Sequence, residues 1–77
     1  MQYRYDKDAD SVYILINDLP YAYSKEVDES RFIDYAKDGT VIGVELLYVS
    51  GGVETSGLPH ASDLDILLDQ HGVKVYA

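Results

Sequence analysis

The stretch "RFIDYAKDGTVIGVELLYV", residues 31–49, contains two apolar runs joined by the dipeptide Asp38-Gly39. Asp-Gly between such runs is the strongest short-range pattern for a β-hairpin, because both central positions of a type I′ turn need a positive φ. A two-residue loop at this dipeptide sets the pairing of the two strands and places Asp34 opposite Gly43. The sequence therefore predicts an antiparallel hairpin here.

The two faces of this hairpin differ in polarity. The predicted register pairs Tyr35 with Ile42 and gives a core face that carries Ile33, Tyr35, Ile42, Val44 and Leu46. Side chains alternate between faces along a strand. The second face therefore mixes apolar groups with two carboxylates, and carries Phe32, Asp34, Val41, Gly43, Glu45 and Leu47.

Asp34 and Glu45 are the candidate functional pair of the chain. They are diagonal neighbours on the second face, where Cβ atoms lie roughly 7–8 Å apart. Two carboxylates at that separation can perform acid–base chemistry or hold a hard cation. The competing interpretation is structural: Asp34 caps a neighbouring backbone group, and Glu45 meets a basic side chain of Arg4, Arg31 or Lys25.

The N-terminal part of the chain predicts further strands. "SVYILIND", residues 11–18, holds an unbroken apolar run that is typical of a strand buried on both faces. The alternating "QYRY" before it predicts a shorter partner strand. After the loop at Pro20, the segment around Tyr21 and Tyr23 suits an edge strand, since proline and charges are tolerated at a sheet edge.

Three aspartates, Asp6, Asp8 and Asp10, stand two residues apart, as the first ligands of a calcium loop do. Such a loop starting at Asp6 requires glycine where the chain has Ser11 and glutamate where it has Asn17. Aspartates also cap and shape turns through their short side chains. We therefore interpret this segment as a turn between two strands and expect no metal there.

The C-terminal third predicts one helix. A Gly/Ser-rich connection at residues 50–60 precedes helix signals at 61–72, and residues 73–77 form a short tail or strand. Ser62 with Asp65 resembles a capping box, and Gly72 suits the position after the helix end. The apolar stripe, from which Ile66 is absent, consists of Leu64, Leu67, Leu68 and His71. His60 and His71 match no metal-ligand spacing, so no cofactor is expected. No catalytic residue is expected either.

Composition limits the possible functions. Seventy-seven residues predict a single domain, 1–77, whose sheet occupies residues 1–49, and the absence of cysteine excludes disulfides and thiolate metal sites. A formal charge of −8 argues against nucleic acid and against an anionic membrane. No apolar run is long enough for a membrane span, so a cytoplasmic protein is expected.

These segments also carry a resemblance. "YDKDADSVYILI" followed by "FIDYAKDGTVIGVEL" resembles the bacterial and archaeal family called domain of unknown function 2283, over residues 3–47. The most specific matches are Asp6, Asp10, Tyr13, Asp34, Tyr35, Gly39, Gly43 and Glu45, and the departures are Val12, Ala36 and Val44. The resemblance implies a small antiparallel meander and no particular activity. Some members of that family lie beside small toxin-like proteins, which is a hint about partners.

The sequence thus predicts an α+β, mainly β fold, an antiparallel meander of four to five strands with one C-terminal helix. One helix covers one sheet face, so we expect a homodimer to cover the other. The interface candidates are Phe32, Val41, Leu47, Ile66, Tyr21 and Tyr23. The first functional hypothesis is a small acidic, self-associating binding or accessory module. The alternatives are an acidic antitoxin-like or inhibitor protein that neutralises a basic protein, and a metal-binding protein or hydrolase that uses Asp34 and Glu45.

Overall fold

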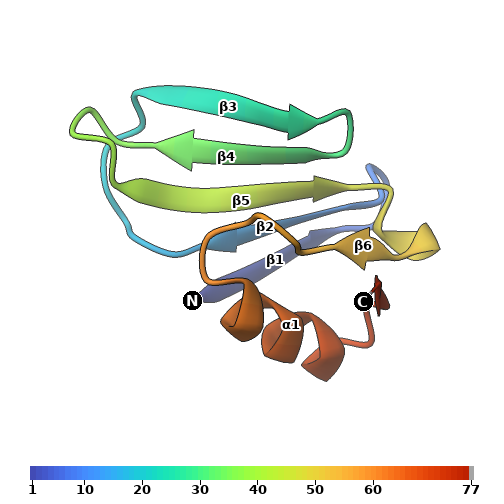
Figure 1. Ribbon diagram of the computed structural model, residues 1–77. Coiled ribbons are helices and arrows are strands. Elements are labelled where there is room, and N and C mark those ends of the chain that lie inside the picture. Colours follow the sequence, from blue (N-terminus) through green and yellow to red (C-terminus); the bar gives the residue numbers. More distant parts are fainter. Residues whose placement is uncertain (77) are drawn as a thin grey trace.

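Five antiparallel strands and one helix form the framework of the computed structural model, which describes residues 1–76 (Figure 1). The strands of the main sheet are β1 (Gln2–Asp6), β2 (Ser11–Leu15), β3 (Tyr23–Asp28), β4 (Arg31–Tyr35) and β5 (Val41–Leu47). A short 3-10 helix (Val49–Gly51) follows, then β6 (Val53–Glu54), α1 (Ala61–Gln70) and β7 (Val75–Tyr76). The predicted antiparallel sheet with one C-terminal helix is confirmed.

The strand order is β1-β2-β5-β4-β3, which departs at one point from the predicted meander. After β2 the chain crosses to the far edge of the sheet, and two hairpins bring β5 back beside β2 (Figure 1). The crossing covers three strand spacings, about 14 Å, and the seven residues 16–22 can span about 23 Å when extended. The result places β5, the longest strand, at the centre of the sheet.

The β4–β5 hairpin has a different turn from the predicted one. Only Gly39 has a positive φ (89°), and its N–H donates to the carbonyl of Ala36 while Ala36 N–H donates to Thr40. This is a three-residue loop with a glycine bulge rather than a type I′ turn. Asp38 shapes it differently: its Oδ1 accepts the Thr40 N–H at 2.9 Å.

A register shift beside this turn changes which side chains reach the core. The predicted pair Asp34–Gly43 is confirmed, but Tyr35 pairs with Val41 and not with Ile42. Val41 therefore packs against the core, whereas Ile42 is buried outside the core cluster. The sequence prediction that put Val41 on the second face and Ile42 on the core face was wrong, because the bulge inserts one residue into β5.

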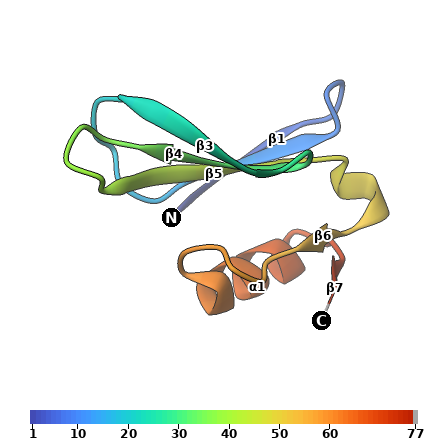
Figure 2. The same ribbon diagram turned by 45° about the horizontal axis from the view of Figure 1, so that its top comes forward.

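α1 lies on one side of the sheet together with β6 and β7 (Figure 2). Its fully buried Leu64 and Leu68 join a core cluster with Val12, Ile14, Ile33, Val44, Leu46, Val49, Val53 and Leu58. In β2 only Val12 and Ile14 are fully buried, while Tyr13 and Leu15 on the other side are half-buried. The prediction that both faces of β2 are buried was therefore wrong for the single chain.

The ends of α1 are fixed by the backbone. His60, with φ 55°, precedes the first turn, and no side chain caps it, so the predicted capping box does not form. Asp65 instead accepts a hydrogen bond from the hydroxyl of Thr55. The helix ends at Gln70, two residues before the predicted end, and Gly72 with φ 75° follows as expected. The Gly72 N–H donates to the backbone carbonyl oxygen of Asp69, and the Val73 N–H donates to that of Leu68. These two hydrogen bonds close the end of the helix.

The predicted Gly/Ser-rich connection at residues 50–60 belongs to the packed structure, because Val53, Thr55 and Leu58 are buried in it. The tail predicted at 73–77 forms β7, which pairs in parallel with β6, and Ala77 lies outside the described residues. No helix in the described part of the chain is both long enough and apolar enough to cross a membrane.

Candidate functional site

The face of the sheet turned away from α1, here called the open face, carries the candidate site. Cross-strand partners point to the same side, so the pairing defines its rows of side chains. One row runs across all five strands as Gln2, Leu15, Gly43, Asp34 and Ser24. The next row runs as Arg4, Tyr13, Glu45, Phe32 and Glu26. Among residues 1–76 no element covers this face (Figure 2).

Tyr13 and Gly43 fit together at the middle of the open face. A Cβ atom at Gly43 would lie 2.5 Å from the Tyr13 hydroxyl oxygen and 2.7 Å from the carbonyl oxygen of Ile14. The phenol ring therefore lies directly over the backbone of β5, which only a glycine permits. From this position the Tyr13 hydroxyl donates a hydrogen bond of 3.0 Å to Oδ2 of Asp34 on β4.

Both carboxylate oxygens of Asp34 are occupied. Oδ2 accepts from Tyr13, and Oδ1 accepts from the hydroxyl of Ser24 at 2.6 Å. Ser24 in turn lies 2.9 Å from the hydroxyl of Tyr21. The pKa of Tyr13 is raised to about 12. Burial of the phenol is the largest cause, and the hydrogen bond to Asp34 is the second largest. The phenol therefore keeps its proton at neutral pH and acts as a fixed donor.

Asp34 and Glu45 lie on the same face in adjacent rows, as the register predicted. Their surroundings differ, because Asp34 is held by two hydroxyls whereas Glu45 is exposed. We expected Asp34 to cap a neighbouring backbone group, but its carboxylate accepts hydrogen bonds from two side-chain hydroxyls instead. Within residues 1–76 a single salt bridge forms, between Arg31 and Asp28, so Glu45 pairs with none of the expected basic residues.

Four residues that carry the family resemblance meet on this face, namely Tyr13, Asp34, Gly43 and Glu45. Their closeness depends on the pairing of β2 with β5, which joins segments that are distant in the chain. The sequence pattern located Asp34 and Glu45 on one face but did not predict that Tyr13 contacts Asp34.

The six interface candidates do not form one surface. Phe32 and Leu47 lie on the open face, and Tyr21 reaches it through its contact with Ser24. Tyr23 stacks on Tyr35 on the side of the sheet that faces the core, with ring centroids 5.1 Å apart. Val41 is on that side too, and Ile66 is 60% exposed on α1.

Two of the three N-terminal aspartates have defined and separate roles. Oδ1 of Asp6 accepts the N–H groups of Asp8 and Ala9, which shapes the β1–β2 turn. Asp10, with φ 51°, accepts from both the N–H and the hydroxyl of Ser50 and so ties this turn to the 3-10 helix. The prediction that this segment is a turn is confirmed, and Asp6 is the aspartate whose side chain shapes it. Within residues 1–76 no group of three or more histidine, aspartate or glutamate side chains is arranged to hold a metal ion.

Millimolar calcium is expected to leave the melting temperature unchanged, because the oxygens of Asp6 and Asp10 already accept hydrogen bonds within the protein. A ligand that binds the folded state must raise the melting temperature. Thermal denaturation followed by circular dichroism, with and without calcium, provides the measurement. A rise of the melting temperature that Asp8→Ala abolishes would contradict the interpretation as a turn.

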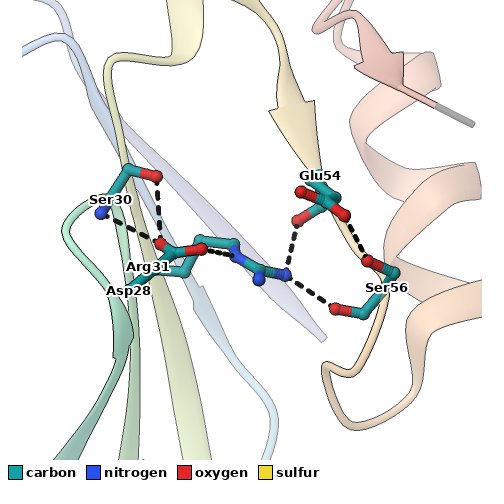
Figure 3. Close-up of polar contacts among 5 residues, drawn as sticks. All are labelled: Asp28, Ser30, Arg31, Glu54 and Ser56. Atoms are coloured by element: carbon teal, nitrogen blue, oxygen red, sulfur yellow. Dashed lines mark hydrogen bonds and ion pairs between the residues drawn. The ribbon is translucent and has the colours of Figure 1, made fainter.

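A second polar centre, which the sequence did not reveal, lies around Arg31 (Figure 3). From β4 its guanidinium donates 2.8 Å to Asp28, and on its far side donates to the carbonyl oxygens of Glu54 (3.1 Å) and Ser56 (2.7 Å). The hydrogen bond from Arg31, and then that from the Ser30 N–H, lower the pKa of Asp28. Figure 3 shows the side chain bridging the sheet and the segment that leads to α1, which indicates a structural role.

The two histidines lie apart from the open face. His71 directly follows α1, and its ring stacks on that of Tyr3 with centroids 3.7 Å apart. This stack borders a surface groove of about 390 Å³ that Tyr5, Ser50 and Lys74 also line. His60 lies at the other end of α1, so the structure does not bring the two histidines together.

Comparison with known proteins identifies one family. The family model described as "Protein of unknown function (DUF2283)" matches residues 2–50. No curated protein and no solved structure matches the chain. The matched segment contains all five strands of the main sheet, and with them the whole open face, and it ends before α1.

Proposed function

The chain belongs to the DUF2283 family, and the segment of the chain that matches the family model, residues 2–50, carries the open face. We propose that this face makes the protein a small self-associating binding module. The proposed partner is a second copy of the chain, and no reaction is assigned to the face. This is the function that the arrangement of side chains supports best.

One observation carries the proposal: the open face is uncovered and carries four large apolar or aromatic side chains. Tyr13 and Leu15 on β2, Phe32 on β4 and Leu47 on β5 are all half-buried on this side. A sheet that buries one face against a helix exposes the other to water unless a partner covers it. An uncovered group of apolar and aromatic side chains on one face is typical of a protein interface.

The hydrogen bonds of the face favour binding over catalysis. An acid–base residue needs a free oxygen or a proton that moves near neutral pH. Asp34 has both oxygens engaged, and the Tyr13 phenol keeps its proton. These contacts hold the two side chains in fixed positions and so provide a rigid surface, which reduces the entropy lost on binding.

Replacing Phe32 tests this proposal. We expect the wild-type chain to self-associate at high micromolar concentration in sedimentation velocity, and Phe32→Ser to sediment as a monomer of 8.6 kDa. Ile66→Ser is the matched control, because Ile66 is exposed on α1 and away from the open face. Circular dichroism spectra establish that each variant is folded. A wild-type chain that stays monomeric at high micromolar concentration would refute self-association.

A second candidate function, an acidic partner for a basic protein, has support from the distribution of charge. The chain has fourteen acidic residues, and within residues 1–76 a single carboxylate among them forms a salt bridge. The remaining charges therefore stay available to attract a cationic surface. A monomeric chain that binds a basic protein, with an association rate that falls steeply as salt rises, would favour this function over self-association.

A further inference from the structure

The second row of the open face is almost self-complementary. From β1 to β3 it places a base, an aromatic ring, an acid, an aromatic ring and an acid, in the order Arg4, Tyr13, Glu45, Phe32 and Glu26. Glu45 lies on the central strand β5. The two aromatic rings flank it, and the two edge residues carry opposite charges.

Two copies can stack their open faces about a twofold axis in two simple ways. An axis parallel to the strands over β5 brings β1 of one copy against β3 of the other, and β2 against β4. An axis perpendicular to the strands brings each strand against its own equivalent. Both are symmetric, closed arrangements in which the same surface of each copy is used.

Charge distinguishes between the two arrangements. The perpendicular axis, passing through this row, opposes Arg4 to Arg4, Glu45 to Glu45 and Glu26 to Glu26, which makes three like-charge contacts. The parallel axis opposes Arg4 to Glu26 twice and leaves one like-charge contact, between the two Glu45 residues. Both axes bring two pairs of aromatic rings together, Tyr13 with Phe32 for the parallel axis and each ring with its equivalent for the perpendicular one, so the charges decide between them.

We infer that the protein forms a homodimer in which the two open faces stack about a twofold axis that runs along β5. The inference rests on the proposed function and specifies its partner and geometry. Stacked sheets of this kind lie about 10 Å apart with strands within about 30° of each other. Gly43 also lies on β5 and has no side chain, so the hydroxyl end of Tyr13 occupies the space above it near the axis.

The size of the face indicates a weak dimer. Five strands spaced by about 4.8 Å, each five residues long at about 3.4 Å per residue, give a face of about 400 Å². Stable interfaces bury about 800 Å² on each partner, so a face of this size belongs to the weak, transient class. The two Glu45 residues beside the axis weaken it further, and Glu45→Gln is expected to tighten the dimer.

Chemical crosslinking through introduced cysteines tests the geometry of the dimer. Because the chain contains no cysteine of its own, only the introduced positions can react. A single Glu45→Cys variant, treated with a short bismaleimide at a concentration where the dimer is populated, is expected to give a covalent dimer. Arg4→Cys alone and Glu26→Cys alone are expected to give none, whereas an equimolar mixture of the two is expected to crosslink. Ile66→Cys is the control for random collision.

Charge reversal gives an independent readout. Arg4→Glu and Glu26→Lys are each expected to weaken dimerisation about tenfold, because each contact occurs twice in the dimer. The double variant is expected to restore wild-type affinity. Self-crosslinking of Arg4→Cys, or a double variant no tighter than the singles, would overturn the parallel axis while leaving self-association intact. A wild-type chain with no dimer would overturn both.

Discussion

Gly43→Ala is expected to destabilise the protein by about 3 kcal/mol, the upper range for overpacking a tight contact. The new Cβ would lie 2.5 Å from the Tyr13 hydroxyl oxygen and 2.6 Å from Cζ of the same ring. Moving the ring away would break its hydrogen bond to Asp34. It would still leave the Ile14 carbonyl oxygen 2.7 Å from the methyl group, so β2 and β5 must separate.

Thermal denaturation measures this effect. For a domain of this size, 1 kcal/mol corresponds to about 4–8 °C, so the melting temperature is expected to fall by about 12–24 °C. Gly51→Ala is the matched control, because its added methyl group would meet no atom beyond the adjacent residues within 4 Å and its φ is not positive. Equal melting temperatures for the two variants would show that Tyr13 does not lie over Gly43.

Arg31→Met is expected to cost at least about 3 kcal/mol, since a single hydrogen bond to a charged group contributes about 1.5–3 kcal/mol and Arg31 donates three. The side chain is only 11% exposed and donates to two backbone carbonyls, those of Glu54 at the end of β6 and of Ser56 after it. Methionine retains most of the packing volume but leaves these carbonyls and Asp28 without the donor. The link between the sheet and the segment before α1 is then lost.

Hydrogen exchange distinguishes this local effect from general destabilisation. The amides of Val53 and Leu58 are expected to exchange faster in Arg31→Met, with a smaller change in the centre of β5. Lys37→Met removes one positive charge from an exposed turn and serves as the control. Arg31→Lys is expected to recover only part of the stability, because lysine cannot direct donors to both sides at once. Full recovery with lysine would refute the bridging geometry.

The sequence predicted those parts of the fold that depend on alternation within one hairpin. Ile33, Val44 and Leu46 reach the core as expected because the pleat places every second residue on one side. The pattern around Asp38-Gly39 fits both a two-residue and a three-residue loop, and the two differ by one residue in register. Val41 and Ile42 are both large and apolar, so composition gave no means of choosing which one faces the core.

The contacts between distant segments were not predictable in the same way. Asp34 and Glu45 share a face because they belong to one hairpin, and the sequence located them correctly. Tyr13 meets Asp34 only because β2 pairs with β5, which no local pattern encodes. Arg31 was missed for a related reason: its acceptors at residues 54 and 56 are backbone carbonyls, which every residue has.

The strand order also affects the synthesis of the protein. β2 is synthesised before its partner β5, which follows roughly 30 residues later, about 2–6 s at typical translation rates. α1, whose Leu64 and Leu68 belong to the same core cluster as the buried side chains of β2, is synthesised later still. During that interval the apolar side of β2 is exposed to chaperones and to other nascent chains. The contact at the centre of the finished sheet therefore cannot form until this interval has passed.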